Sequence, residues 1–252
     1  MKGKVKRRVI AWVLSFALVM GTVLGGPGLF MKAHAADAGV LYIIDSIGGT
    51  PESVTEDCTD SAGGWSYDAG TATLTLDGFQ GEYIEANGDI NIVLKGKNKI
   101  TISAESTEGI KSTGKVTIDD TISPVQDCLD IYCNDGTESV SMIYTGGFGA
   151  DYATYIVGGT VNLVEENTRR RYVTGISRWA YVENDASLNI NLSADGGRNG
   201  AAALLNLNTS GDTSFRVNSL SSSSYGVYSL DKKGSGDTAL TAGGKAQNIG
   251  NK

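Results

Sequence analysis

Acidic side chains crowd one short stretch of the chain, and together they could bind a cation. Five of them define this candidate metal site: Asp119, Asp120, Asp127, Asp130 and Asp135. Carboxylates at this density repel one another unless a cation lies among them, and oxygen ligands of this kind suit calcium. The spacing matches neither an EF-hand loop nor a calcium-binding nonapeptide repeat. A calcium site is one interpretation, and a loop of solvated acids is the other.

Aromatic side chains offer a second kind of chemistry, because flat rings can stack against the C–H faces of sugars. Phe148 and Tyr152 belong to a glycine-rich segment, while Trp179 and Tyr181 lie just before a predicted coil. These four residues are candidates for carbohydrate binding. Trp65, by contrast, is expected to pack in the interior.

Arg170 is the middle of the basic run 169–171 in an otherwise acidic chain. Its guanidinium could bind a uronate carboxylate through two hydrogen bonds, could act as a base beside calcium as in polysaccharide lyases, or could simply be solvated. A glycosidase would need two carboxylates on either side of a sugar, and the sequence selects no such pair. The one histidine, His34, lies in the predicted leader, so the mature chain excludes Ser-His-Asp and Cys-His catalysis and histidine-ligated zinc.

Short β-strands in a repeated pattern are the elements expected to position these residues. Apolar residues alternate with Asn, Thr and Ser, and sustained helical periodicity is absent. One phrase, a short apolar stretch followed by a turn and an alternating strand, recurs every 20–27 residues or so in five segments: 81–96, 108–120, 153–166, 180–196 and 202–219. This length suits one coil of a solenoid and is too short for helical repeats. We predict an all-β right-handed parallel β-helix, with a β-sandwich as the alternative.

The middle residue of each alternating strand is expected to face solvent. Stacked coils lie about 4.8 Å apart, so these residues would form one polar stripe. It would consist of Asn91, Thr117, Ser141, Asn162, Asn189 and Arg216. Amide groups such as those of Asn162 and Asn189 could bond an extended glycan, or they could belong to an ordinary solvated face. Glycine and asparagine residues before the strands are expected to supply positive-φ corners.

The sequence predicts three segments. Residues 1–35 combine a basic start, an apolar run and Ala33-His34-Ala35, which together are typical of a secretory signal peptide. An uncleaved membrane anchor is the alternative. Residues 36–80 are expected to form an N-terminal cap of short strands. Residues 81–252 are expected to form the coils, the last of them frayed or incomplete.

Cleavage of the leader would leave a strongly acidic protein. It removes six basic residues and no acidic one, which moves the formal net charge from −7 to −13. Such a chain, secreted or held at the cell surface, should repel nucleic acid and anionic membranes. Export also permits disulfides. Cys128 and Cys133 could pair, or these two and Cys58 could remain thiols.

Two phrases carry a resemblance to a known family. The segments GGWSYDAGTATLTLDGF (63–79) and NGDINIVLKGKNKITIS (87–103) resemble secreted or surface β-helix proteins of gram-positive bacteria, often described as carbohydrate-binding domains. The likeness is strongest over residues 63–118. It implies a right-handed parallel β-helix and, for some members, calcium-dependent binding of acidic or plant-wall polysaccharides.

We therefore expect an exported carbohydrate-binding protein that recognises an extended polysaccharide. The ligand could be an acidic glycan, and calcium could assist its binding. A surface adhesin or spacer with a protein partner is the first alternative. A polysaccharide lyase or glycosidase is the second, since a shared fold does not decide between such functions.

Overall fold

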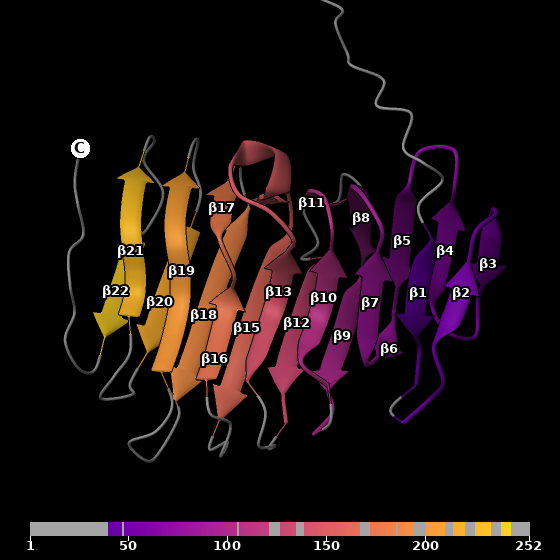
Figure 1. Cartoon of the computed structure of the whole chain (residues 1–252), viewed down its shortest axis with the longest axis horizontal. Helices are drawn as coiled ribbons and strands as arrows, with labels where there is room; N and C mark the ends of the chain where they lie inside the picture. Colours follow the sequence, from indigo (N-terminus) through magenta and orange to yellow (C-terminus); the bar gives the residue numbers. More distant parts are fainter. Residues whose placement is uncertain are drawn as a thin grey trace, which may run out of the picture. The chain divides into compact units, whose positions relative to one another are not determined.

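The chain divides into two units, Met1–Ala35 and Ala36–Lys252. The computed structural model describes much of the second unit (Figure 1): residues 40–46, 48–104, 106–120, 127–134, 139–166, 172–184, 186–193, 200–209, 214–219, 225–232 and 238–242. The predicted signal peptide, Asp135 and Arg170 lie outside the described residues.

The described part of the chain is all-β, as predicted. Its strands form one 15-stranded and one 7-stranded sheet, and most neighbouring strands within them are parallel. Neither sheet closes on itself among the described strands. The helical element seen in these residues is a single 3-10 turn, η1 (Ala150–Tyr152).

Most strands belong to three lines of parallel neighbours. The first strand line contains β7 (Tyr83–Ala86), β10 (Glu108–Ser112), β13 (Val140–Thr145) and β16 (Tyr172–Ile176). The second strand line contains β5 (Thr73–Asp77), β8 (Ile90–Lys95), β11 (Val116–Asp120), β14 (Thr154–Ile156) and β17 (Trp179–Val182). The third strand line contains β6 (Gln80–Gly81), β9 (Lys97–Ile102), β12 (Cys128–Cys133), β15 (Thr160–Glu166), β18 (Ser187–Ser193), β20 (Ser214–Ser219) and β22 (Thr238–Ala242). From β7 to β18 the chain visits the three lines in order and then starts again one strand further along.

Strand β19 (Gly200–Thr209) joins the first and second lines. Its first residues pair with β16 and its last residues pair with β17. Strand β21 (Tyr225–Lys232) then pairs with β19 over most of that length. The 15-stranded sheet is therefore two lines connected through one long strand.

The N-terminal strands pair with the first strand of the first line and of the second line. Strand β1 (Leu41–Ile44) pairs antiparallel with both β7 and β2 (Glu52–Val54). Strands β3 (Cys58–Asp60), β4 (Trp65–Asp68) and β5 form an antiparallel meander, and β5 and β6 then run parallel to β8 and β9. Trp65 is buried, as expected, and its indole Nε1 donates to Asp45 Oδ2 over 3.4 Å.

Columns of branched aliphatic side chains form the core. One column runs along each line, and its members are paired directly: Ile84, Ile110, Ile143 and Ile176; Ile92, Ile118, Ile156 and Val182; Ile100, Ile131, Leu163 and Ile190. All twelve are at most 1% exposed. No single set of three strands could bury such a column, so each set depends on its neighbours.

Corners between lines require unusual backbone, as predicted. Gly88 lies between β7 and β8 with φ 117°, and Gly159 lies between β14 and β15 with φ 70°. A Cβ on Gly159 would also lie 2.8 Å from the carbonyl oxygen of Asp127. Glycine is favoured there both by its conformation and by the close approach of backbone.

The predicted repeat slips by one strand between residues 120 and 153. Segments 81–96 and 108–120 hold strands of the first and second lines, whereas 153–166 and 180–196 hold strands of the second and third. The predicted spacing of 20–27 residues is too short here, because the neighbours Asp130 and Asn162 are 32 residues apart. Apolar alternation is the same in every line, so the pattern could not tell which line a strand joins.

Of the two states considered for the cysteines, the structure has the thiols: Cys58, Cys128 and Cys133 are all free. Cys128 and Cys133 both lie in the extended strand β12. Five residues of strand separate their Cα atoms by about 16 Å, whereas a disulfide needs less than about 7 Å.

Candidate functional site

Outward-facing groups on the second strand line form a continuous column. Direct register pairs link Thr73, Asn91, Thr117, Tyr155 and Tyr181, one residue on each successive strand. Asn91 is exposed and the other four are half-buried. We call these five residues the outer column. It places hydroxyl, amide and phenol groups about 4.8 Å apart along roughly 19 Å of surface.

Two tyrosines form one end of the outer column. The rings of Tyr155 and Tyr181 stack with centroids 4.5 Å apart and planes 6° from parallel. The Nζ atom of Lys115 lies 5.7 Å from the Tyr155 ring centroid. Burial, and then the nearby Tyr181, Glu183 and Asp151, raise the pKa of Tyr155, so its phenol stays a hydrogen-bond donor.

The segment 146–153, which connects β13 to β14, lies beside this tyrosine pair. The Tyr155 hydroxyl donates to the carbonyl oxygen of Ala150 in η1 over 3.3 Å. Phe148 is 74% exposed, and the guanidinium carbon of Arg178 lies 4.0 Å from its ring centroid. A cation over one ring face favours this arrangement and leaves most of the side chain in solvent.

Arg178 is held in a conformation that arginine rarely adopts. Its φ is 87°, and backbone in such a region costs on the order of 1–3 kcal/mol. Strain of this kind persists only where surrounding contacts fix it, and it is commonest at functional positions. The cation–π contact between Phe148 and Arg178 therefore involves a residue whose backbone is held in a strained conformation.

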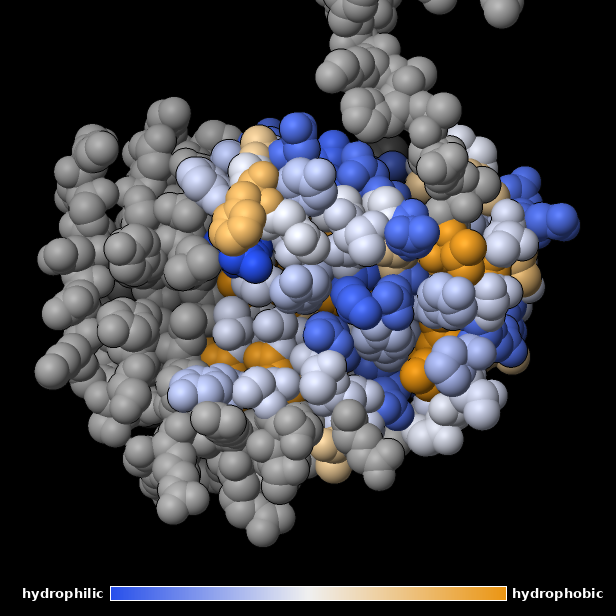
Figure 2. Space-filling model, in the orientation of Figure 1, coloured by the Kyte–Doolittle hydropathy of each residue, from blue (hydrophilic) through white to orange (hydrophobic). Residues whose placement is uncertain are grey.

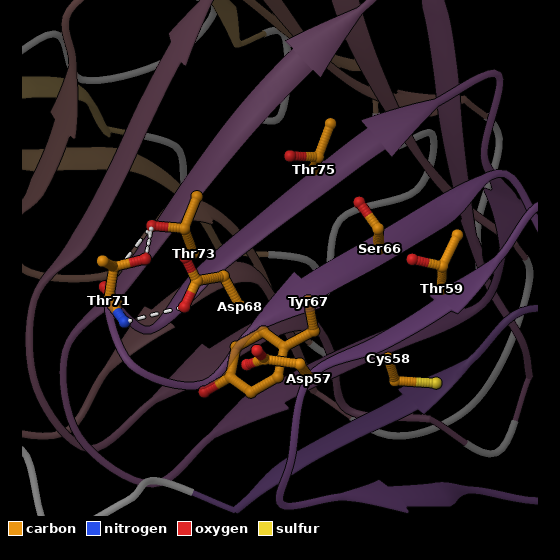
Figure 3. Close-up of a pocket in the computed structure, with 9 residues that line it drawn as sticks. All are labelled: Asp57, Cys58, Thr59, Ser66, Tyr67, Asp68, Thr71, Thr73 and Thr75. Atoms are coloured by element: carbon orange, nitrogen blue, oxygen red, sulfur yellow. Dashed lines mark hydrogen bonds between the residues drawn. The ribbon is translucent and has the colours of Figure 1, made fainter.

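A hollow of about 430 Å³ opens at the other end of the outer column. Strands β3, β4 and β5 form its floor, and Figure 3 shows hydroxyl side chains from all three. The nine lining residues are Asp57, Cys58, Thr59, Ser66, Tyr67, Asp68, Thr71, Thr73 and Thr75. Thr73 belongs to both the hollow and the outer column, so the two form one continuous surface.

The predicted single stripe divides among the three strand lines, which corrects the sequence interpretation. Asn91 and Thr117 lie on the second line, Ser141 on the first, and the remaining three on the third: Asn162, Asn189 and Arg216. The one-strand slip of the repeat explains the error.

Asn162 and Asn189 bond to their own neighbours. The Nδ2 of Asn162 donates to Asp130 Oδ1 over 2.6 Å, and the Nδ2 of Asn189 donates to Asn162 Oδ1 over 2.8 Å. Such side-chain ladders are typical of stacked parallel strands. We call these three residues the closed column, because much of its hydrogen-bonding capacity is used internally.

Of the other predicted binding residues, Tyr152 is 39% exposed and packs its ring against Gly147. Trp179 is half-buried in β17, paired in register with Asn206. Phe148 and Tyr152 thus belong to segment 146–153, and Tyr181 stacks on Tyr155, which bonds to that segment. Asn162 and Asn189 belong to another strand line.

The predicted calcium ligands that the structure describes lie at the end of β11, immediately before β12 and within β12. Asp119 and Asp120 end β11, where Asp119 Oδ1 accepts the Asp120 amide over 2.8 Å. Asp127 is buried and accepts the Gly96 amide over 2.7 Å, while Asp130 bonds to Asn162. The residues that the structure describes contain no group of three or more acidic, cysteine or histidine side chains placed to hold a metal ion.

Strands of the first line carry a salt bridge on their outer face. Lys111 Nζ lies 2.8 Å from Glu85 Oε1, and the Tyr83 hydroxyl donates to Glu85 Oε2 over 2.8 Å. Burial raises the pKa of Glu85, but the bonds from Lys111 and Tyr83 outweigh it, and the pKa lies below its ordinary value. The bond to Glu85 raises the pKa of Lys111.

The outer column and the hollow contain residues that sequence reasoning missed. Tyr155 was hidden by the slipped repeat, although its pairing with Tyr181 follows once β14 and β17 are aligned. The alternation Thr71, Thr73, Thr75 is visible in the sequence and could have indicated a hydroxyl-rich strand face.

The outer surface offers little continuous apolar area on the side seen in Figure 2, where apolar residues form small separate patches. Across the described residues, no helix is long and apolar enough to cross a membrane.

Comparison with known proteins identifies no relative. No protein-family model matches the chain, and no curated protein or solved structure is significantly similar to it.

Proposed function

We propose that this chain is an exported carbohydrate-binding protein built as a right-handed parallel β-helix. Three lines of parallel strands, visited in order by the chain, support a helical coil. Right-handed crossovers are the near-universal choice for parallel strands joined within a sheet. In this proposal each coil supplies one strand to each line, and the N-terminal strands β1 to β4 cap the first coil.

The outer column is the observation that carries the proposed binding function. Its hydroxyl, amide and phenol groups recur at the strand spacing, which is close to the length of one sugar unit in an extended chain. Because the column lies on rigid strands, its groups need little ordering on binding. An extended polysaccharide lying along the second strand line could bond to one group in each coil.

Phe148 extends this surface beside the tyrosine end. Its exposed ring could stack against the C–H face of a sugar while Arg178 fixes its orientation. The ring would provide apolar contact and the outer column would provide hydrogen bonds. This combination of one platform and several polar groups is the usual composition of a ligand site.

Calcium remains part of the proposal as an ion that Asp119 and Asp120 could help to bind. Their Oδ1 atoms would each lie 2.6 Å from a Cβ on Gly158, so both carboxylates turn toward the same corner. Further oxygen ligands would be needed for calcium coordination.

A protein-binding surface is the second candidate function. Strands β2 and β3 stand at the two edges of the 15-stranded sheet, and open edges can pair with a strand of another chain. An adhesin or spacer of this kind would use those edges and leave the outer column in water. A lyase or glycosidase is the third, and it would release shortened sugars.

Affinity electrophoresis of the full chain through gels containing soluble polysaccharides tests the proposal. We expect retardation in at least one glycan gel, with and without a chelator as separate arms. Phe148→Ala should reduce retardation, whereas Tyr172→Ala, a change at another exposed aromatic residue on the first strand line, should leave it unchanged. Equal mobility in every gel would contradict the proposal, and release of reducing ends would favour an enzyme.

A further inference from the structure

The hollow beside β3, β4 and β5 has a regular array of hydroxyl groups. Thr59, Ser66 and Thr75 are direct register neighbours on the three strands. Figure 3 shows their side chains on the same side of the sheet. Within the described part of the chain, these three hydroxyls bond to no other protein group. They are therefore available to donate to a ligand and to accept from it.

Two carboxylates complete the hollow. Asp57 Oδ1 accepts the Ala69 amide over 2.9 Å, and Asp68 Oδ1 accepts the Thr71 amide over 3.1 Å. These bonds fix both side chains and, among the described residues, leave the second oxygen of each carboxylate without a partner. The Asp68 charge also reaches the floor, because burial and then Asp68 raise the pKa of the Tyr67 phenol.

No lysine or arginine is among the nine residues that line the hollow in the described chain. A ligand entering it meets hydroxyls, carboxylate oxygens and one buried phenol. Sugar hydroxyls can donate to carboxylates in charge-assisted hydrogen bonds, which are stronger than neutral ones. A uronate or sulfate would instead place a negative charge beside two others without a cation to offset them.

The hollow is also directly continuous with the outer column. Thr73 lies in both, and Asn91 Nδ2 donates to the carbonyl oxygen of Thr71 over 3.2 Å. Beyond β3 the 15-stranded sheet has no further strand among the described residues. A chain lying along the outer column would therefore meet the hollow as its last contact.

We propose that the hollow binds the end of a neutral polysaccharide chain and makes the protein select neutral over acidic glycans. This inference rests on the proposed function and replaces the expected acidic ligand with a neutral one. Asp57 and Asp68 accept hydrogen bonds from sugar hydroxyls and repel uronates. Thr59, Ser66 and Thr75 provide the remaining polar contacts, and no metal ion takes part.

The test compares two probes of equal length, cellohexaose and hexagalacturonate, by titration calorimetry on the full chain. The wild-type protein should bind the neutral probe more tightly. Asp57→Asn/Asp68→Asn removes both charges but keeps an acceptor for each backbone amide. The double variant should reduce the neutral-to-acidic affinity ratio by about tenfold, the effect of losing one good charge-assisted bond. Asp89→Asn is the matched control, since Asp89 accepts the Lys115 amide over 2.8 Å outside the hollow.

A second measurement needs no change at the hollow. Cys58 is an exposed thiol at its rim, whereas Cys128 is half-buried and Cys133 is buried. Saturating cellohexaose should slow alkylation of Cys58 by iodoacetamide several-fold without changing that of Cys128. Because no metal ion takes part in the hollow, a chelator should not alter the protection of Cys58.

The possible outcomes separate the two proposals. An unchanged affinity ratio in the double variant, or alkylation of Cys58 at the same rate with ligand bound, would overturn the neutral-end site. If Phe148→Ala still weakened glycan binding when the neutral-end site had failed these tests, the proposed glycan-binding function would stand without the neutral-end site. Protection that requires calcium would make the hollow a cation site instead. No binding of any glycan would overturn both proposals.

Discussion

The outer column and the closed column have the same spacing but differ in whether their members bond to one another. Both run along parallel strands and both consist of polar side chains. In the closed column, Asp130, Asn162 and Asn189 bond to one another, so much of their capacity is used within the fold. In the outer column, whose five residues the structure describes, no side-chain hydrogen bond joins one member to the next: Thr73 and Asn91 bond to Thr71, and Tyr155 bonds to Ala150. A polar stripe on stacked strands can thus serve stability or recognition, and the side-chain bonds decide which.

The largest effect is expected from the core beneath the outer column. Ile156→Ala should lower the free energy of unfolding by about 2–5 kcal/mol, because Ile156 is fully buried between Ile118 and Val182. Urea denaturation followed by circular dichroism measures the change. Thr117→Ala on the outer face should cost far less. A similar loss in both variants would mean that the outer column is a structural element.

Glycan affinity should distinguish the two columns next. Tyr181→Ala should weaken binding of the best glycan roughly three- to tenfold, because one ring of the stacked pair is lost. Asn189→Ala should leave that affinity within error. Calorimetric titration of each variant provides the values, and the comparison fails if Asn189→Ala weakens binding as much as Tyr181→Ala.

Substitutions in the closed column should instead lower the free energy of unfolding. Asn162→Ala should cost about 1 kcal/mol, because it removes two side-chain hydrogen bonds from the closed column. A double-mutant cycle with Asn189→Ala isolates the Asn162–Asn189 bond. Additive losses in that cycle would show that the two amides do not stabilise each other.

The smallest expected effect lies outside both columns, at the Glu85–Lys111 pair. The lowered pKa of Glu85 means that its contribution is present above the ordinary value of 4.5 and is lost as pH falls through the folded pKa. The raised pKa of Lys111 means that its contribution is complete below 10.5 and is lost as pH rises through the folded pKa. Both side chains are about a third exposed, so the pair should contribute less than about 1 kcal/mol.

Thermal melts between pH 3 and pH 8 measure this contribution. Glu85→Gln should flatten the part of the acid-side slope that is due to the pair, while Glu52→Gln on the exposed strand β2 serves as control. An unchanged slope in Glu85→Gln would mean that the salt bridge does not contribute in solution.

The sequence predicted where strands occur but not which strands pair with one another. Alternation around Ile90, Ile118, Leu163 and Ile190 correctly predicted short strands with buried aliphatic residues, and hence an all-β chain of parallel strands. It could not assign those strands to lines, because the same alternation serves every line.

The candidate site was harder to predict for the same reason. Phe148 and Tyr181 were found because aromatic residues are conspicuous in a sequence. The hollow was missed because it depends on the register of β3, β4 and β5, which brings Thr59 beside Ser66 and Ser66 beside Thr75. Such neighbours follow from pairing and not from spacing along the chain.

Segment 146–153 has a consequence for how this surface could diversify. It is a long connection between β13 and β14, and it contains the turn η1. The strands on either side of it keep their parallel register, so the aliphatic columns are uninterrupted. A connection that leaves the core unchanged can be lengthened, shortened or exchanged as a cassette at little cost in stability. Replacing this segment with other sequences would alter ligand preference while the strands keep their positions. The fold could therefore serve as a scaffold for different binding segments.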